Sequence, residues 1–158
     1  MAESYPDPVV FDTRPDATLA VTRGTVRLLR NMGMACLTEV SLNTGRRVDV
    51  LALDKKGLAT VVEVKSSLED YAVDAKWTEY LPFCDRFYFA VPITFPIEIL
   101  PDSVGLIIAD AYGASIERSA AEGSMNGTRR KALTLRFARL AADRFADLMD
   151  PKLTAKRI

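Results

Sequence analysis

The alternation of apolar and polar side chains divides the chain into helical and extended segments. Apolar and small side chains recur at helical spacing over residues 16–32, 68–83 and 129–149, which predicts three amphipathic helices. Asp16 is a candidate N-cap for the first helix, and Gly33 is a stop signal after it. The inward positions expected in the first helix are Leu19, Ala20, Thr22, Val26, Leu29 and Met32. Those expected in the last helix are Leu133, Phe137, Leu140, Ala141, Phe145 and Leu148.

Runs of β-branched and aromatic residues predict the strands. They cover residues 35–42, 46–54, 58–66, 86–91 and 104–109, with 114–118 as a candidate for a short edge strand. The turn sequence Asp-Lys-Lys-Gly at 54–57 predicts that the second and third strands form an antiparallel hairpin. The resulting order, α-β-β-β-α-β-β-α, predicts a mixed β-sheet flanked by helices, in the α/β (α+β) class.

The chain length of 158 residues suits one domain with one hydrophobic core. Prolines and acids in residues 1–15 predict an irregular N-terminal arm, followed by a single domain over 16–150 and a C-terminal tail over 151–158. No stretch approaches the roughly 20 apolar residues of a membrane span, and the N-terminus lacks the features of a signal peptide. Cys36 and Cys84 have apolar neighbours and are expected to be buried free thiols, which points to a cytoplasmic location.

The chain contains no histidine, which narrows the chemistry available to it. Ser-His-Asp and Cys-His nucleophile systems are excluded, as are the common zinc hydrolases and nucleases with an imidazole base. The formal net charge is zero, from 21 basic and 21 acidic residues. A strong nonspecific DNA-binding protein usually carries a basic excess, so this balance counts mildly against one unless the basic residues are clustered.

Charged residues interrupt two otherwise apolar strands of the predicted hairpin. Asp49 lies within Val48-Asp49-Val50-Leu51, and Glu63 and Lys65 lie within Val62-Glu63-Val64-Lys65. Strand side chains alternate between faces, so Glu63 and Lys65 share a face, and Asp49 can face Glu63 from the neighbouring strand. Two carboxylates brought so close repel each other unless a proton or cation lies between them. A hard divalent ion with oxygen ligands meets that requirement.

These residues carry a resemblance to a known class of nucleases. Asp49, followed by a turn and then Glu63-Val64-Lys65, resembles the D…(D/E)-x-K signature of the PD-(D/E)XK, or restriction-endonuclease-like, superfamily. The predicted order of helix, three-stranded meander, helix and further strand matches that superfamily. The stretch from Lys65 through Trp77 to Val91 is similar, more narrowly, to the bacterial MmcB-like family of DNA repair proteins, over about residues 15 to 110. Val48 replaces the proline that gives the superfamily its name.

The resemblance implies a role for each residue of the motif. Asp49 and Glu63 would each give a carboxylate oxygen to Mg²⁺ or Mn²⁺, and the backbone carbonyl of Val64 would be a third ligand. Lys65 would orient or deprotonate the attacking water and stabilise the transition state. Glu39 in the first strand is a candidate for an auxiliary metal ligand, with a surface-facing residue as the alternative.

Several other charged residues are candidates for an accessory role. Asp74 and Lys76 follow the motif at a position where superfamily members often place a residue that assists the site, and a solvated helix flank is the alternative. The candidates for nucleic-acid contacts are Arg23, Arg27, Arg46, Arg47, Arg130 and Lys131. Basic residues at the start of the last helix oppose the helix macrodipole, so a DNA phosphate or an internal carboxylate would compensate them. Trp77 and Tyr80 are expected to be core or groove-wall aromatics.

Three hypotheses about function follow from the sequence. The first is a metal-dependent DNA nuclease in repair, which hydrolyses phosphodiester bonds and acts with DNA and with a repair partner or as a homodimer. The second is a nuclease-fold module with little or no turnover that binds DNA or a repair protein. The third is an unrelated scaffold in which Asp49 and Lys65 form only a structural ion pair, and Glu63 caps a neighbouring backbone group or pairs with Arg47.

Overall fold

A computed structural model describes residues 16–73 and 76–151 of the chain. Its helices and strands, in chain order, are α1 (Asp16–Asn31), β1 (Ala35–Ser41), β2 (Arg47–Leu53), β3 (Ala59–Val64), α2 (Leu68–Val73), the 3₁₀-helix η1 (Trp77–Phe83), β4 (Arg86–Val91), the 3₁₀-helix η2 (Ile97–Ile99), β5 (Gly105–Ala109), β6 (Ala114–Arg118) and α3 (Gly127–Met149). The arm predicted for 1–15 and most of the tail predicted for 151–158 lie outside the described residues.

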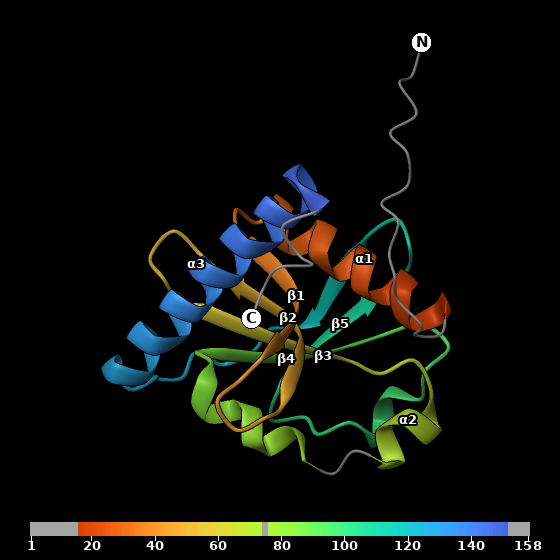
Figure 1. The fold of residues 1–158 in the computed structure, drawn as a ribbon. Helices are drawn as coiled ribbons and strands as arrows, with labels where there is room; N and C mark the ends of the chain where they lie inside the picture. The colour runs from red at the N-terminus through yellow and green to blue at the C-terminus, as the bar shows by residue number, and fades with distance from the viewer. Residues whose placement is uncertain (1–15, 74–75, 152–158) are drawn as a thin grey trace.

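The strands of the described chain form one mixed sheet of six, in the order β1-β2-β3-β4-β5-β6 (Figure 1). β1, β2 and β3 are an antiparallel meander, whereas β4 and β5 run parallel to β3. β6 pairs antiparallel with β5 at the far edge. This architecture confirms the predicted α+β class, the hairpin at residues 54–57 and the edge strand at 114–118.

The turn between β2 and β3 is fixed by its own side chain and by a glycine. Asp54 Oδ1 accepts the backbone N–H groups of Lys56 and Leu58 at 2.8 and 2.9 Å. Gly57 has a φ of 82°, in the left-handed region that costs glycine little. The short turn sets the register of the hairpin, and therefore determines which residues of β2 and β3 face each other.

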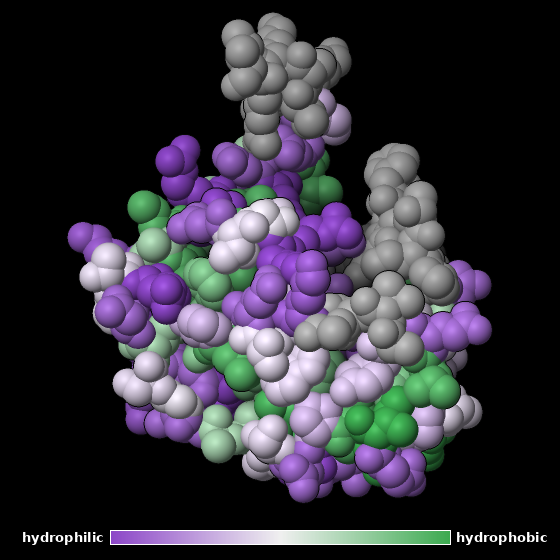
Figure 2. All heavy atoms as spheres, turned by 90° about the horizontal axis from the view of Figure 1, so that it is seen from below, coloured by the Kyte–Doolittle hydropathy of each residue, from purple (hydrophilic) through white to green (hydrophobic). Residues whose placement is uncertain are grey.

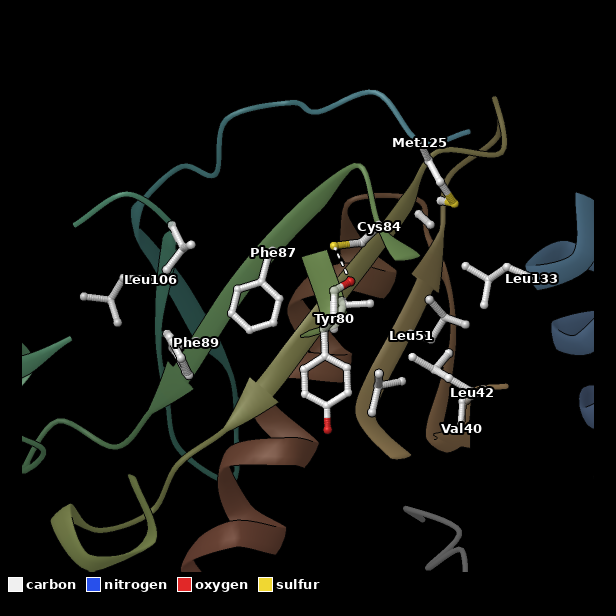
Figure 3. Packing of buried hydrophobic residues seen from close by; sticks show 14 of the residues in the cluster. Val40, Leu42, Leu51, Tyr80, Cys84, Phe87, Phe89, Leu106, Met125 and Leu133 are labelled. Atoms are coloured by element: carbon white, nitrogen blue, oxygen red, sulfur yellow. Dashed lines mark hydrogen bonds between the residues drawn. The ribbon is translucent and has the colours of Figure 1, made fainter. Parts of the chain in front are cut away.

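Two hydrophobic cores cover the two faces of the sheet. The η1-side core is built mainly from Val40, Leu42, Val48, Leu51, Val61, Tyr80, Cys84, Phe87, Phe89, Leu106, Met125 and Leu133. Figure 3 shows the aromatic rings and aliphatic side chains of this core packed against the strands, with Leu133 reaching in from α3. The α1-side core is built from Val21, Leu29, Val50, Ala52, Val62, Val64, Tyr88, Ala90, Ile107 and Ala109.

Helix α1 approaches the sheet more closely than a side chain at Gly24 would allow. A Cβ at this position would lie 2.0 Å from the carbonyl oxygen of Asp110 and 2.4 Å from that of Gly113, so the helix backbone rests on the β5–β6 turn. Because of this placement, Val21 and Thr25 are buried in addition to the expected Thr22 and Leu29. The inward position expected for Met32 is wrong, because this side chain lies at the exposed end of the helix and is 49% exposed.

The continuous helix predicted over 68–83 is wrong. α2 ends at Val73, and the chain resumes at Trp77 as a 3₁₀-helix that contains Pro82. A 3₁₀-helix has three residues per turn, so Trp77, Tyr80 and Phe83 stack on one side and pack against the η1-side core. A spacing of three residues suits this geometry better than an α-helix, and proline inside an α-helix would also remove a hydrogen bond.

The inward face predicted for the second half of α3 is also wrong. Leu133 is buried, and Phe137 and Leu140 pack partly against the η1-side core. Phe145 and Leu148, in contrast, are 65% and 81% exposed. α3 contacts β1 and η1, and β1 is the edge strand, so the sheet offers no surface beneath the last turns of the helix.

Within the described part of the chain, no helix combines the length and the apolar character that crossing a membrane requires. Figure 2 shows one face of the molecule, on which hydrophilic side chains predominate and hydrophobic ones form smaller patches between them. Both predicted free thiols are present: Cys84 is buried and Cys36 is half-buried. Burial raises the pKa of Cys36 to about 11 and that of Cys84 to about 12.

Candidate active site

Asp49 lies where β2 changes the face that its side chains present. Val48 and Leu51 both pack in the η1-side core, whereas Val50 between them packs in the α1-side core. In a regular strand, residues three apart point to opposite faces, so the alternation is broken at Asp49. The side chain of Asp49 is half-buried at this break.

β1 has the same break, next to Asp49. Glu39 lies between the paired positions of β1 that flank Asp49, so the two residues face each other. Glu39 has a φ of 52°, the one positive φ of a non-glycine residue in the described chain. Leu37 and Val40, three residues apart, both pack with the η1-side core. The alternation of side chains is therefore broken in both strands at the same position, that of Glu39 and Asp49.

The structure brings Asp49 and Glu63 together across β2 and β3. Val50 pairs with Val62, and the same register places Asp49 opposite Glu63 one step further along. Glu63 Oε1 accepts the backbone N–H of Asp49 at 3.3 Å. Asp49 Oδ2 accepts the backbone N–H of Val64 at 2.7 Å. Each carboxylate therefore satisfies a backbone donor of the opposite strand, just where the ladder between the two strands ends.

β3 ends at Val64, and Lys65 continues in the same extended direction. Its backbone N–H donates to the carbonyl oxygen of Ala90 at 3.0 Å, so the extended conformation and the pairing with β4 persist. Alternation then places the Lys65 side chain on the same face as that of Glu63. Lys65 is 5% exposed and Glu63 is 4% exposed. The following residue, Ser66, accepts a hydrogen bond from Thr18 Oγ1 of α1 at 2.9 Å, which ties the strand end to the first turn of the helix.

Aromatic residues of η1 wall this end of the sheet. The hydroxyl of Tyr80 donates to the carbonyl oxygen of Arg47, two residues before Asp49, at 3.2 Å. The ring of Trp77 packs edge-on against that of Phe89, which is the partner of Glu63 in the register of β3 and β4. The expectation that Trp77 and Tyr80 are core or groove-wall aromatics is confirmed.

The donor set at this position suits a hard divalent cation. Asp49 and Glu63 supply carboxylate oxygens, and Mg²⁺ prefers oxygen ligands and usually retains several waters, so few protein ligands are needed. Among residues 16–73 and 76–151, no cluster of three or more acidic or cysteine side chains is placed to bind a metal. Two carboxylates, supplemented by the carbonyl of Val64, are thus the set that these residues offer at the ends of β2 and β3.

Arg46 and Arg47, two of the residues predicted to contact nucleic acid, lie close to acidic side chains of the same chain. Arg46 Nε donates to Glu79 Oε2 at 2.7 Å, which links the start of β2 to η1. A guanidinium nitrogen of Arg47 lies 3.7 Å from Glu39 Oε1, and the Arg47 side chain is 60% exposed. Glu39, the candidate auxiliary ligand, therefore faces Asp49 through its backbone position and contacts Arg47 through its carboxylate.

Of the two predicted accessory residues, the structure describes Lys76. Lys76 is exposed just before the 3₁₀-helix η1, and its carbonyl oxygen accepts the N–H of Glu79 at 3.0 Å. Asp74 lies outside the described residues. The accessory roles of both residues stay predictions.

Arg23 and Arg27 lie on α1, on the other side of the sheet from Glu63. Both are exposed, and Arg27 donates to the carbonyl oxygen of Tyr112 at 3.1 Å. α1 packs on the α1-side core, whereas the alternation along β3 places Glu63 on the η1 side. The structure therefore does not bring this arginine stripe and the acidic pair to one surface.

Arg130 is compensated by a carboxylate within the chain, which is one of the two alternatives that the sequence left open for the basic start of the last helix. Its guanidinium makes two hydrogen bonds to Asp85, of 2.6 and 2.7 Å, and a third to the carbonyl oxygen of Gly57 at 3.0 Å. Asp85 is buried, and the hydrogen bonds from Arg130 hold the pKa of its carboxyl below the ordinary value of 3.8. Lys131, the next residue of α3, is exposed.

Arg144 is a residue whose importance sequence reasoning missed. It donates to the carbonyl oxygens of Thr38 and Glu39 at 2.6 and 3.0 Å, and so holds the break in β1 from α3. These partners are more than a hundred residues away in the sequence, and no local pattern around Arg144 indicates them.

The fold and this cluster define an α+β domain with a largely buried, charged site where the ladder between β2 and β3 ends. Residues 6–152 match the family described as DNA repair protein MmcB-like, so the chain belongs to the MmcB-like family, as its sequence resemblance predicted. A solved structure of a protein of unknown function from Silicibacter pomeroyi shares 44% sequence identity and a TM-score of 0.84, covering 87% of this chain and 94% of that chain. The comparison with curated proteins gave no match.

Proposed function

We propose that the chain is a metal-dependent DNA nuclease of a repair process, with Asp49, Glu63 and Lys65 as its catalytic residues. The observation that carries the proposal is that Asp49 lies opposite Glu63 across β2 and β3, with the buried Lys65 on the same face as Glu63. Membership in the MmcB-like DNA repair family supports DNA as the substrate. The antiparallel meander β1-β2-β3, followed by β4 parallel to β3, supports the resemblance to the PD-(D/E)XK nucleases.

The chain's residues would divide the work as follows. Asp49 and Glu63, with the carbonyl of Val64, would hold Mg²⁺ or Mn²⁺ at the end of the hairpin. When bound, such an ion supplies positive charge at the scissile phosphate and lowers the pKa of a bound water. Lys65 would orient the attacking water with its ammonium group and stabilise the negative charge that develops on the phosphate. The burial of Glu63 and Lys65 strengthens these electrostatic interactions, because nearby water would otherwise screen them.

The first test is cleavage of labelled duplex and single-stranded DNA by purified protein with Mg²⁺ or Mn²⁺. Lys65→Met removes the ammonium group and retains an apolar chain of similar length, so we expect cleavage to fall by roughly a hundredfold or more. Lys55→Met is the matched control, because Lys55 is exposed in the β2–β3 turn at the opposite end of the hairpin. Equal cleavage by the wild type and Lys65→Met would end the proposal.

Metal binding gives a second measurement that does not depend on turnover. Asp49→Asn keeps an oxygen that can accept the N–H of Val64 but removes a negative charge, so the hairpin should persist while the cation is lost. We expect Mn²⁺ to raise the thermal midpoint of the wild type and not that of Asp49→Asn. Identical midpoint shifts in the two proteins would contradict the assignment of Asp49 as a ligand.

A second candidate function is a binding module without turnover. Asp49 and Glu63 each satisfy a backbone donor, and this structural role needs no catalysis. DNA binding that is unchanged by chelator, together with no cleavage under any metal, would select this function over the nuclease.

A further inference from the structure

A concave surface beside the acidic pair carries much of the positive charge of α3. It is a groove of about 810 Å³ between α3 and the adjoining ends of β1 and β2. Its charged lining residues are Arg47, Arg136, Arg139, Arg144, Glu39 and Asp143. We call it the arginine groove. Four arginines against two acids leave an excess of two positive charges here, in a chain whose total charge is zero.

Hydrogen bonds within the groove orient Arg136 and Arg144 without neutralising them. Arg136 donates to the side-chain oxygen of Asn43 at 3.1 Å, and Arg144 donates to two backbone carbonyls. These acceptors are neutral, so each guanidinium keeps its full charge and further N–H donors. Arg136 and Arg139 are exposed on consecutive turns of α3, where a ligand in the groove can reach both.

The groove adjoins the strand that carries Asp49. Arg47 lies in its wall, two residues before Asp49 on β2. Glu39 also lines it and faces Asp49 across the β1–β2 pair, where opposed Cα atoms are about 5 Å apart. A chain of phosphates that follows the arginines would therefore approach the start of β2, where Asp49 lies opposite Glu63.

We infer that the arginine groove binds the phosphate backbone of DNA and directs it to Asp49 and Glu63. The destination of the strand rests on the proposed function, whereas binding in the groove does not. The residues that line the groove include Leu135 and Leu140 but no aromatic side chain, so it has arginines for phosphates and no platform on which bases could stack. Contacts to phosphate alone make the binding independent of sequence and strongly dependent on salt.

The test is fluorescence anisotropy with labelled duplex DNA in the presence of EDTA, so that cleavage plays no part. Arg136→Ala/Arg139→Ala removes two exposed charges, and we expect Kd to rise roughly tenfold or more at physiological salt. Each lost phosphate contact also lowers the slope of log K against log salt by about 0.9, so the double variant should lose about 1.8.

Two matched variants decide between this surface and others. Lys55→Ala/Lys56→Ala removes the same charge from the exposed turn at the far end of the β2–β3 hairpin and should leave affinity and salt slope unchanged. Arg23→Ala/Arg27→Ala tests the stripe on α1. The inference is overturned if Arg23→Ala/Arg27→Ala is the variant that loses affinity for DNA. It is also overturned if the groove variant binds DNA as tightly as the wild type, or if the wild type binds no DNA. Binding lost only in the groove variant, with no cleavage by any protein, would keep the inference and remove the nuclease.

Discussion

Asp85 begins the connection into β4 with 1% of its side chain exposed, and Arg130 of α3 covers it. Its second oxygen also accepts the backbone N–H of Ala59 at 2.8 Å, so one carboxylate joins β3, β4 and α3. The bidentate geometry and the backbone donor together offset the cost of burying the negative charge. The molecule thus depends on a charge pair that no catalytic role requires.

Removal of the Arg130 guanidinium should therefore lower the stability of the fold. Arg130→Ala leaves Asp85 buried without its main partner, so we expect the free energy of unfolding to fall by about 3 kcal/mol, measured by urea denaturation at pH 7. Arg86→Ala is the control: Arg86 and Glu122 form an exposed ion pair of similar length, and its loss should cost less than about 1 kcal/mol.

The same comparison has a pH dependence with a defined sign. The folded-state pKa of Asp85 is lowered below its ordinary value of 3.8. Its contribution is therefore complete above that value and is lost as the pH falls through the folded-state pKa. The stability difference between the wild type and Arg130→Ala should shrink in acid below about pH 4. A difference that stays constant from pH 7 to pH 3 would contradict the role of the Asp85 charge.

At this scale, the sequence predicted contacts within a hairpin and no others. Asp49 and Glu63 lie on strands joined by a five-residue connection, so alternation and turn length were enough to place them side by side. Asp85 and Arg130 are 45 residues apart, and the sequence indicated only that the start of the last helix needs an anion. The identity of that anion, Asp85, depends on how α3 packs against the sheet.

Among the elements, the break in β1 is the clearest source of local strain. A non-glycine residue in the left-handed region, such as Glu39, costs roughly 1–2 kcal/mol, and Arg144 holds the adjoining carbonyls in place. Neither feature follows from the pattern of β1, which predicts an ordinary strand. The break accounts for how Val48 and Leu51 of β2 reach the same core.

Two substitutions at Glu39 should separate backbone strain from side-chain contacts. Both Glu39→Gly and Glu39→Val lose the contact with Arg47. Glycine adopts a positive φ readily, whereas a β-branched residue resists it. We expect the glycine variant to be more stable than the valine variant by about 2 kcal/mol in thermal or urea unfolding. A valine variant as stable as the glycine variant would show that the break relaxes without cost.

The helices were the elements for which pattern reasoning was least accurate. The apolar spacing over 68–83 indicated one α-helix, but a spacing of three residues also fits a 3₁₀-helix, and packing of Trp77 and Tyr80 on the sheet selected it. In α3, the apolar stripe continues past the edge of the sheet, where Phe145 and Leu148 have no strand beneath them. Periodicity shows which side of a helix is apolar but not how far its neighbours extend.

In the whole molecule, β3 occupies the most protected position. Every residue of this strand is buried, with β2 on one side and β4 on the other. β1 and β6 form the two edges, and most of their residues are half-buried or exposed. The class and much of the strand order followed from the sequence, but the parallel pairing of β3 with β4 and of β4 with β5 depends on long connections that carry no register signal.

Hydrogen exchange should follow this arrangement. We expect the backbone amides of β3 and β4 to exchange only on global unfolding, and those of β1 and β6 to exchange faster through local opening. Mass spectrometry of peptides from each strand, at several urea concentrations, measures these rates. Exchange in β3 as fast as in β6 would contradict a single cooperative sheet.

The hold of Arg144 on β1 has a consequence for encounters between molecules. An edge strand exposes backbone groups to which a strand of another chain can add, and natural sheets often block that addition. In this protein, the left-handed residue interrupts the edge and a guanidinium occupies the carbonyl oxygens of Thr38 and Glu39. Arg144, although distant from β1 in the sequence, thereby hinders the addition of a strand from a second molecule at this edge of the sheet.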